Sequence, residues 1–454
     1  MRSKRPPSSS IHLVTPHPIS RPQDVAETAV DVAIVGAGVA GLRLASLLED
    51  AAFTIVLLEA RDRVGGRVYT LHDPLSPVPL ELGAEFVHGR PPELWRHIEA
   101  GRLRAVKVEG DNIYRSSGEA SEAADAIETA DRLLSEAAPQ MDEPFRRFLE
   151  RTQLSPAAKR AVAGYIEGFN AASLDSIGVL GLVRQQRAEH DIDGGQVFRI
   201  VDGYDAVPLL LLRSLREPGV LRLNTVVERI EWRRGWVRIR ARSLGTDLAV
   251  SARFCAITAP LGVLQSGAIQ FDPDPPAVRR AIHQLAMGDA VRVTLRFRRP
   301  FWEDRPELKN VSFLHAPDEE FPTWWTQAPV RVPVVTAWTG GPTAAKFALC
   351  GPEAVISTAL DCMSRAFQTD RRALADELAA WRYHDWRNDP FSRGAYSYVP
   401  AGALDAIEAL TRPVDGSLFF AGEASDPDGH WGTVHGAMRS AERAAAQIRA
   451  AAGR

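Results

Sequence analysis

The sequence has few cysteines and no long apolar run. Its three cysteines, Cys255, Cys350 and Cys362, have neither the spacing of a disulfide framework nor that of a metal or redox site. We therefore predict no disulfide and no metal site, and we expect a cytoplasmic protein. No stretch reaches 18 apolar residues, so the sequence predicts no transmembrane helix.

An excess of charge of one sign is also missing. The formal net charge is −3 over 454 residues. This balance gives no electrostatic reason to expect a nucleic acid or an anionic membrane as a partner. Lysine is scarce as well, because only five of the 54 basic residues are lysines. The length allows two domains, and we expect a monomer or a homodimer.

Residues 1–29 are rich in proline and serine and lack the apolar core of a signal peptide, so we expect a disordered tail there. From Asp31 the pattern changes. The run VDVAIVGAG is typical of a buried strand, VAGLRLASLLED has helical spacing, and FTIVLLEA is typical of a second strand. Residues 31–59 therefore predict one βαβ unit.

A glycine-rich fingerprint lies between this strand and this helix. Gly36 permits a tight turn, Gly38 lets the backbone approach a pyrophosphate, and Gly41 allows close helix–strand packing. Glu59 ends the second strand, where its carboxylate can accept the ribose hydroxyls, so FAD or NAD is favoured over NADP. The turn also brings Ala37, Val39 and Ala40 to the cofactor.

The segment after Glu59 distinguishes FAD from NAD. It reads Ala60-Arg61-Asp62-Arg63-Val64-Gly65-Gly66-Arg67. This run resembles, residue for residue, the E-A-R-x-R-x-G-G-R motif of the flavin amine oxidase superfamily, which contains monoamine oxidases, polyamine oxidases, amino-acid oxidases and lysine-specific histone demethylases. The resemblance implies that Ala60, Arg61, Gly66 and Arg67 contact FAD, and Arg67 brings a fixed positive charge.

The resemblance extends over residues 30 to 450. Matching segments include 81–89 (ELGAEFVHG), 259–264 (APLGVL), 420–423 (FAGE) and 432–437 (GTVHGA). In the family the last segment begins a helix that points at the flavin, where its dipole stabilises negative charge. Further cofactor contacts are implied for Gly83, Ala84, Glu85, Val227, Trp386, Gly422, Glu423, Thr433, Val434 and Ala437.

The fold class that follows is α/β, with a Rossmann-like FAD-binding domain of the glutathione reductase type interleaved with an α+β substrate domain. Residues 120–190 have helical patterns, whereas the segments of 220–258 alternate as an antiparallel meander would. Residues 287–299 and 334–339 are typical of a second sheet. We assign 30–105, 195–270 and 385–454 to the FAD domain, and 106–194 and 271–384 to the substrate domain.

Four residues are candidates for the chemistry. The resemblance places Tyr396 in an aromatic cage beside the flavin, with Thr433 where monoamine oxidases have a second tyrosine. His88 occupies a position that faces substrate in polyamine oxidases, where a titrating group could bind a second amine. The alternatives are a half-buried strand tyrosine for Tyr396 and a histidine bonded to nearby backbone for His88.

Arg292 is the main departure from the family. It occupies the place of a lysine that holds a water against flavin N5. Arginine keeps the charge but has a planar fork and no accessible neutral form. We expect Arg292 to face the flavin; the alternative is a structural ion pair, for example with Asp289. A second departure is Ala395, which replaces the cysteine that tethers the flavin in monoamine oxidases, so we predict non-covalent FAD.

The predicted function is FAD-dependent amine oxidation. A hydride leaves the carbon next to nitrogen for flavin N5, the imine hydrolyses to an aldehyde, and O2 reoxidises the flavin to give H2O2. One alternative is a dehydrogenase or desaturase that uses another acceptor, which Arg292 keeps open. The other is a non-catalytic scaffold stabilised by flavin. The sequence leaves open whether the substrate is a monoamine, a polyamine or an amino acid.

Overall fold

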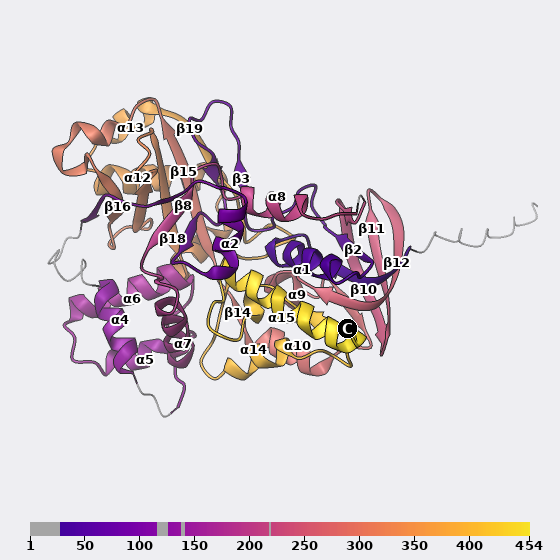
Figure 1. Cartoon of the computed structure of the whole chain (residues 1–454). Coiled ribbons are helices and arrows are strands. Elements are labelled where there is room, and N and C mark those ends of the chain that lie inside the picture. The colour runs from indigo at the N-terminus through magenta and orange to yellow at the C-terminus, as the bar shows by residue number, and fades with distance from the viewer. Residues whose placement is uncertain (1–27, 116–125, 138–140, 218) are drawn as a thin grey trace, which may run out of the picture.

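The computed structural model describes residues 28–115, 126–137, 141–217 and 219–454. Strand β1 (Thr28–Val35) begins three residues before the start predicted at Asp31. Most of the predicted tail, residues 1–27, lies outside the described residues. The described part consists of one large mixed sheet, a second sheet of six strands and a group of helices beside them (Figure 1).

The large sheet has the order β13-β10-β11-β12-β1-β2-β9, with β21 also paired to β12. Its centre is parallel, because β1 pairs in parallel with both β12 and β2. Its edge is the antiparallel meander that the alternating segments predict. The strands after β1 are β2 (Ile55–Leu58), β9 (Leu221–Arg222), β10 (Thr225–Arg233), β11 (Trp236–Ser243), β12 (Thr246–Ile257), β13 (Gln270–Asp272) and β21 (Leu418–Phe420).

Helices cover both faces of this sheet, because alternate residues of its central strands point to opposite sides. Phe254 and Ala256 of β12 pack into one core, whereas Cys255 and Ile257 pack into the other. The first core is closed by α1 (Val39–Asp50), α2 (Pro92–Ala100), α8 (Ala206–Arg213) and α15 (Val434–Ala452). The second is closed by α9 (Leu261–Gln265), α10 (Pro276–Gln284) and α14 (Leu404–Thr411).

The second sheet has the order β19-β15-β18-β17-β16-β7 and is antiparallel except for the pair β16–β7. Its strands are β7 (Asp111–Tyr114), β15 (Ala290–Phe297), β16 (Val311–His315), β17 (Thr323–Thr326), β18 (Val334–Gly340) and β19 (Leu378–Tyr383). It packs on α11 (Pro342–Ala345), α12 (Pro352–Ala366) and α13 (Arg371–Glu377) through an apolar core.

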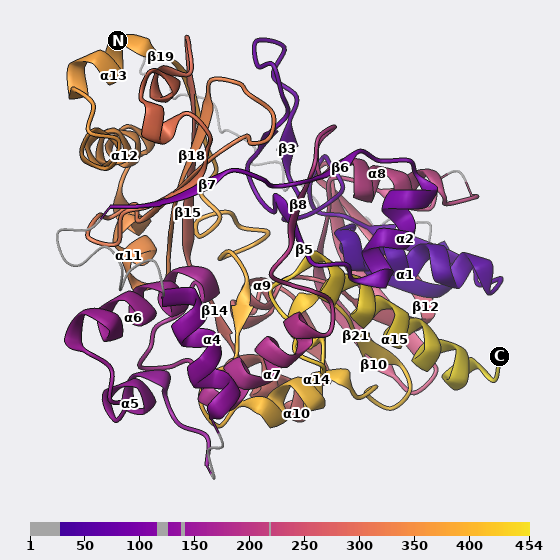
Figure 2. The ribbon, with the colours of Figure 1, turned by 60° about the vertical axis from the view of Figure 1, so that its left-hand side comes forward.

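A helical group lies at the other end of this sheet, as Figure 2 shows. It has its own apolar core and comprises α4 (Ala126–Glu136), α5 (Phe145–Glu150), α6 (Pro156–Asn170) and α7 (Val179–His190). Short strand pairs connect the parts: β3 (Thr70–Leu71) with β4 (Leu80–Glu81), β14 (Ala286–Met287) with β20 (Ser397–Tyr398), and β8 (Val197–Ile200) with β5 (Phe86–His88) and β6 (Ala105–Lys107).

Candidate active site

One cavity of about 1520 Å³ extends from the glycine-rich turn to the helical group. This is larger than a single small ligand needs and suits a dinucleotide together with a substrate. Every predicted site residue lines it except two, Ala37 and Gly41. Because these residues come from segments far apart in the sequence, the fold brings the predicted fingerprint, loop and C-terminal segments to one place.

The two residues that do not line the cavity support its wall. A Cβ atom on Gly41 would lie 1.9 Å from the carbonyl oxygen of Gly36, so only glycine fits where α1 leaves the turn. Gly36 itself has φ +104°, a conformation that side chains disfavour. The Ala37 amide donates to the Glu59 carboxylate at 2.7 Å. Both residues therefore shape the turn rather than face the cofactor space.

Glu59 directly follows β2 and lines the cavity. Its second oxygen accepts from the Arg61 amide at 2.9 Å, so backbone contacts fix the carboxylate in place. Burial raises the pKa of Glu59, while these amides and Arg61 act in the opposite direction. Each carboxylate oxygen retains a lone pair for a further donor such as a ribose hydroxyl.

Arg61 and Arg67 are both engaged by carboxylates. Arg61 makes a bidentate pair with Asp389, with both N–O distances 2.8 Å. Arg67 contacts Glu423 at 2.7 Å and donates to the Ala395 carbonyl at 3.0 Å. Although burial acts to raise the pKa of Glu423, the adjacent Arg67 charge and hydrogen bonds hold it below its usual value. These pairs join the segment after Glu59 to the C-terminal half of the site.

Glu423 lines the cavity and also holds neighbouring segments of the site together through hydrogen bonds. Its carboxylate accepts from the Ser397 hydroxyl at 2.6 Å and from the Gly432 amide at 2.8 Å. The helix α15 then begins at Val434, where the Thr433 hydroxyl caps the Gly436 amide at 2.9 Å and donates to the His430 carbonyl at 2.6 Å. The N-terminus of α15, with its partial positive charge, lies in the cavity wall.

Tyr396 forms one wall of the substrate end. Its hydroxyl donates to the Phe169 carbonyl at 2.7 Å, and its ring lies parallel to Trp338, with centroids 6.5 Å apart and planes 8° apart. Thr433 caps α15 and brings no ring to this wall. Trp338 is the ring that faces Tyr396, and the sequence did not identify it. Trp338 falls in the predicted strand 334–339, but no motif marks it.

His88 packs among aromatic rings at the same end of the cavity. Its ring makes edge contacts with Phe86 and Phe169, with centroids 6.4 and 5.9 Å apart. No hydrogen bond joins its ring to another of the described residues, so the alternative of a histidine bonded to nearby backbone is not found. Burial lowers its pKa to about 4, and His88 is therefore neutral at about pH 7.

Arg292 lines the cavity from β15, directly across from Trp338 on β18. It is buried, it donates to the Gly83 carbonyl at 2.9 Å, and it makes a close ion pair with Glu85. The pair with Asp289 that we considered was wrong, because Asp289 pairs with Arg387 instead. The side chain thus both faces the cavity and belongs to a structural ion pair.

Glu85 has more partners than its predicted cofactor role suggests. Its carboxylate is 2.8 Å from a second guanidinium, that of Arg199, and accepts from the Trp325 indole at 3.0 Å. Burial acts to raise its pKa, but the charges of Arg292 and Arg199 hold the pKa below its usual value. Two guanidinium groups and one carboxylate leave this cluster with a net positive charge at the cavity wall.

The outer part of the cavity, between α4, α6 and α7, contains a feature that the sequence did not reveal. Glu189 lines it beside Gln185 and Tyr165. Burial and the nearby Asp131 raise the pKa of Glu189 to about 7. Helix α6 connects this region to the inner end, since Tyr165 stacks on Phe169 one turn away, with centroids 5.6 Å apart.

Comparison with known proteins agrees with this arrangement. A family model for flavin containing amine oxidoreductases matches residues 39–193 and 181–449. The chain belongs to this family. It is therefore an FAD-dependent enzyme that oxidises amines.

Individual relatives are identical to this amine oxidase at somewhat more than a quarter of the aligned positions. It is 28% identical to polyamine oxidase 5 of Oryza sativa subsp. japonica, over 92% of this chain and 87% of that protein. It is 27% identical to lysine-specific histone demethylase 1 homolog 3 of Arabidopsis thaliana, over 92% of this chain and 30% of that one.

Solved structures show the same fold. Wild-type putrescine oxidase bound to putrescine matches with a TM-score of 0.79 at 23% identity, covering 93% of this chain and all of the other. Cyclohexylamine oxidase from Brevibacterium oxydans IH-35A matches equally well at 21% identity, over 94% of this chain and all of that one.

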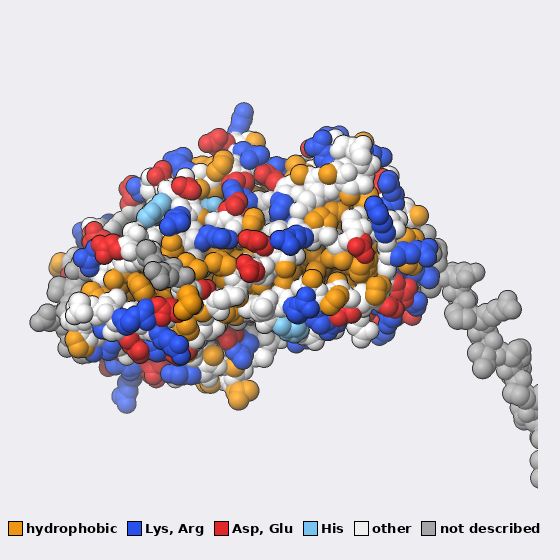
Figure 3. All heavy atoms as spheres, turned by 90° about the horizontal axis from the view of Figure 1, so that it is seen from below, with side chains coloured by type: hydrophobic (Ala, Val, Ile, Leu, Met, Phe, Trp, Pro, Cys, Tyr) orange, Lys and Arg blue, Asp and Glu red, His pale blue; other side chains and the backbone are white. Residues whose placement is uncertain are grey.

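The surface of this amine oxidase mixes charges of both signs, and basic and acidic side chains are interspersed over the face in Figure 3. Within the described ranges, no helix combines the length and the apolar character that crossing a bilayer requires.

Proposed function

We propose that this enzyme oxidises an amine at the carbon next to its nitrogen to an imine, which hydrolyses to an aldehyde, while O2 takes the electrons and yields H2O2. When bound, FAD supplies the acceptor of the hydride through its N5 atom. The observation that carries the proposal is the parallel pair of Tyr396 and Trp338 in the cavity wall, where the Tyr396 hydroxyl also bonds to helix α6.

The residues present fit FAD. At Gly38 a Cβ would meet nothing within 4 Å, which leaves room for a pyrophosphate. Glu59 offers its carboxylate to a ribose, and the N-terminus of α15 faces the cavity. None of the three cysteines lines the cavity, and Ala395 occupies the wall beside Tyr396. FAD is therefore held without a covalent bond.

The inner end of the cavity suits a neutral amine. The rings of Tyr396 and Trp338 offer two parallel apolar walls, which orient an alkylamine and exclude water. His88 carries no charge at about pH 7, because its pKa is about 4. An ammonium group thus finds no charged partner in His88, and the cavity carboxylates Glu85 and Glu423 are already paired with arginines. The amine therefore enters the reaction after losing its proton.

The outer part of the cavity suits a second positive charge. Among the described residues no cation pairs with Glu189, although its carboxyl lines the cavity and Asp131 lies nearby. A substrate ammonium placed there would stabilise the ionised carboxylate. Glu189 lies beyond Tyr165 and Phe169, which are one turn apart on α6. A substrate nitrogen at Glu189 would therefore be separated from the reacting nitrogen by more than the length of one helical turn. We therefore propose a polyamine as substrate, in line with the polyamine oxidases among its relatives.

An electron acceptor other than O2 is the second candidate for reoxidation of the flavin. Arg292 is held by Glu85 and by the Gly83 carbonyl. Its planar guanidinium is thus committed to these two partners, whereas the lysine of the family's motif carries a compact ammonium. This arrangement is the reason to keep an acceptor other than O2, such as a quinone or a carrier protein, as the second candidate.

One pair of measurements tests the proposal. The holoenzyme is mixed without oxygen with spermidine, putrescine, a simple monoamine and an amino acid, and bleaching of the flavin spectrum is followed. Reoxidation is then compared between O2 and an artificial quinone. We expect bleaching by the polyamine and one H2O2 per aldehyde. If no amine bleaches the flavin, the proposal is wrong; if only the quinone restores the colour, the acceptor is not O2.

A further inference from the structure

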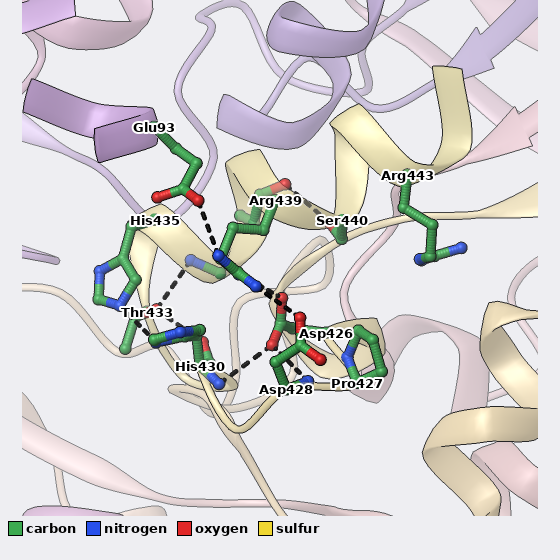
Figure 4. A network of polar contacts seen from close by, with 12 residues as sticks. Glu93, Asp426, Pro427, Asp428, His430, Thr433, His435, Arg439, Ser440 and Arg443 are labelled. Carbon is green, nitrogen blue, oxygen red and sulfur yellow. Dashed lines mark hydrogen bonds and ion pairs between the residues drawn. The ribbon is translucent and has the colours of Figure 1, made fainter. Parts of the chain in front are cut away.

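Two buried histidines lie at the start of α15. His435, the second residue of the helix, is 4% exposed and lines the cavity, and His430, in the preceding loop, is 6% exposed. The Nε2 atom of His435 lies 3.2 Å from the Nδ1 atom of His430, which is hydrogen-bond distance. Figure 4 shows the two rings next to each other, joined by this contact. The two side chains form a continuous path that starts at the cavity.

The path is open at both ends. Among the described residues, neither the Nδ1 atom of His435 nor the Nε2 atom of His430 has a hydrogen-bond partner. Neither atom is sealed off in the interior, because neither is among the buried side-chain nitrogens that lack a partner; each therefore opens to the cavity or to solvent. Each ring here has one nitrogen free to exchange a proton while the other nitrogen holds its neighbour.

A charged network lies beyond His430 and reaches the surface. The His430 amide donates to Asp426 at 3.1 Å. Arg439 joins Asp426 to Glu93 and to Asp428, at 3.3, 2.7 and 2.5 Å, and it lies between these carboxylates in Figure 4. The Asp428 side chain is 59% exposed, so the network ends in solvent. One oxygen of Glu93 is buried and has no partner among the described residues.

The charges around the pair come from three sides. His435 faces His430, His88 and Arg439, and burial lowers its pKa well below the usual value. His430 is also held low mainly by burial, while Asp426, Glu93 and Asp428 act to raise its pKa. Both rings are neutral at about pH 7, so each carries one donor and one acceptor nitrogen. Such a pair can pass a proton on without storing it.

We propose that His435 and His430 relay the proton lost by the substrate ammonium from the cavity to solvent, beside the carboxylates that hold the His430 loop. The inference rests on the proposed function, because only amine oxidation supplies this proton. An N–H bond of the ammonium breaks, its electron pair stays on nitrogen, and the proton goes to Nδ1 of His435. The proton on Nε2 of His435 passes to Nδ1 of His430, whose Nε2 proton leaves to solvent. No electron is transferred in these steps.

The test is His430→Gln in the FAD-loaded enzyme, with His435→Gln as a second variant. His283→Gln, on an exposed position of α10, is the matched control. The rate of flavin bleaching by spermidine without oxygen is measured across pH. We expect a loss of roughly tenfold or more at about pH 7, because positioned proton transfer contributes at least that much. The loss should vanish above about pH 10, where the amine is already neutral.

Two further readouts separate a relay from a structural role. Proton release to solvent, followed with an indicator dye on mixing with spermidine, should slow in both histidine variants but not in the control. The FAD content and the melting temperature should stay close to wild type in at least one of them. A loss that persists at high pH, or variants that match His283→Gln at low pH, would overturn the relay alone. If wild type is not bleached by any amine, the proposed function and the relay are both wrong.

Discussion

The Arg292 guanidinium and the Glu85 carboxylate form a buried ion pair in the wall of the cavity. Arg199 contacts the same carboxylate at 2.8 Å. The pair therefore lies within a three-residue cluster that no single segment of the sequence contains. It ties the segment beside the cofactor space to β15 and to β8.

The cluster predicts that Glu85→Gln is strongly destabilising. The substitution leaves two buried guanidinium groups without a counter-charge, which costs about 3–5 kcal/mol. Chemical denaturation of the FAD-saturated enzyme measures the free energy of unfolding. Arg104→Gln, which removes an exposed pair with Asp202, should cost less than about 1 kcal/mol. Equal losses in the two variants would show that the buried cluster is not held by charge. Adding Arg292→Met to Glu85→Gln should recover part of the loss, since it removes one unpaired charge.

Much of the large sheet could be predicted from the sequence, because its strands alternate or form short apolar runs. The fingerprint at Gly36 to Gly41 predicts a tight turn between a strand and a helix. The structure confirms this turn between β1 and α1. The meander of β10, β11 and β12 follows from its alternation. These features are local, so residues close in sequence determine them.

The pairings inside the site could not be predicted, because they join residues far apart in the chain. Arg292 and Glu85 are separated by 207 positions, and Tyr396 meets Trp338 from another strand. No motif surrounds Glu189 in the sequence. Its candidate role in binding an amine can be inferred only from its position in the cavity wall. A motif identifies residues that a family shares, but it does not reveal the partners that one chain has acquired.

The turn at Gly41 predicts a loss of cofactor binding on substitution. In Gly41→Ala the new Cβ would lie 1.9 Å from the Gly36 carbonyl oxygen, a backbone atom that cannot move aside without opening the turn. We expect purified protein with little FAD, measured by its flavin absorbance, and a lower melting temperature. Gly168→Ala is the control, because its Cβ meets nothing within 4 Å and alanine favours a helix. Normal FAD content in Gly41→Ala would contradict the assigned role of the turn.

The parallel rings predict that Trp338 matters more than the Tyr396 hydroxyl. Trp338→Ala removes one apolar wall, a loss of about 1.5–3 kcal/mol of contact free energy, which corresponds to a fall in kcat/KM of about tenfold or more. Trp338→Phe keeps a flat wall and should recover most of the activity. Tyr396→Phe loses the bond to the Phe169 carbonyl and should cost only a few-fold. If Trp338→Ala retains full kcat/KM for every amine, the ring pair does not hold the substrate.

The raised pKa of Glu189 predicts that the free energy of unfolding falls as the pH rises. Its pKa is about 7 in the folded protein, above its usual value of 4.5. The folded state therefore holds this proton more tightly than the unfolded chain does. The stability contributed by Glu189 is fully present below about pH 4.5 and is lost as the pH rises through about 7. Glu189→Gln should remove this loss, so its melting temperature should gain on wild type between pH 5 and 8.

The same titration governs how a polyamine binds. A distal ammonium pairs with the ionised carboxylate, so the KM of wild type for spermidine should fall as the pH rises from 6 to 8. In Glu189→Gln the KM should be higher at pH 8 and should lose this fall. A monoamine of similar apolar length serves as the internal control, because it lacks the second charge and its KM should respond equally in both proteins. A parallel response of spermidine and the monoamine to the substitution would place the distal ammonium elsewhere.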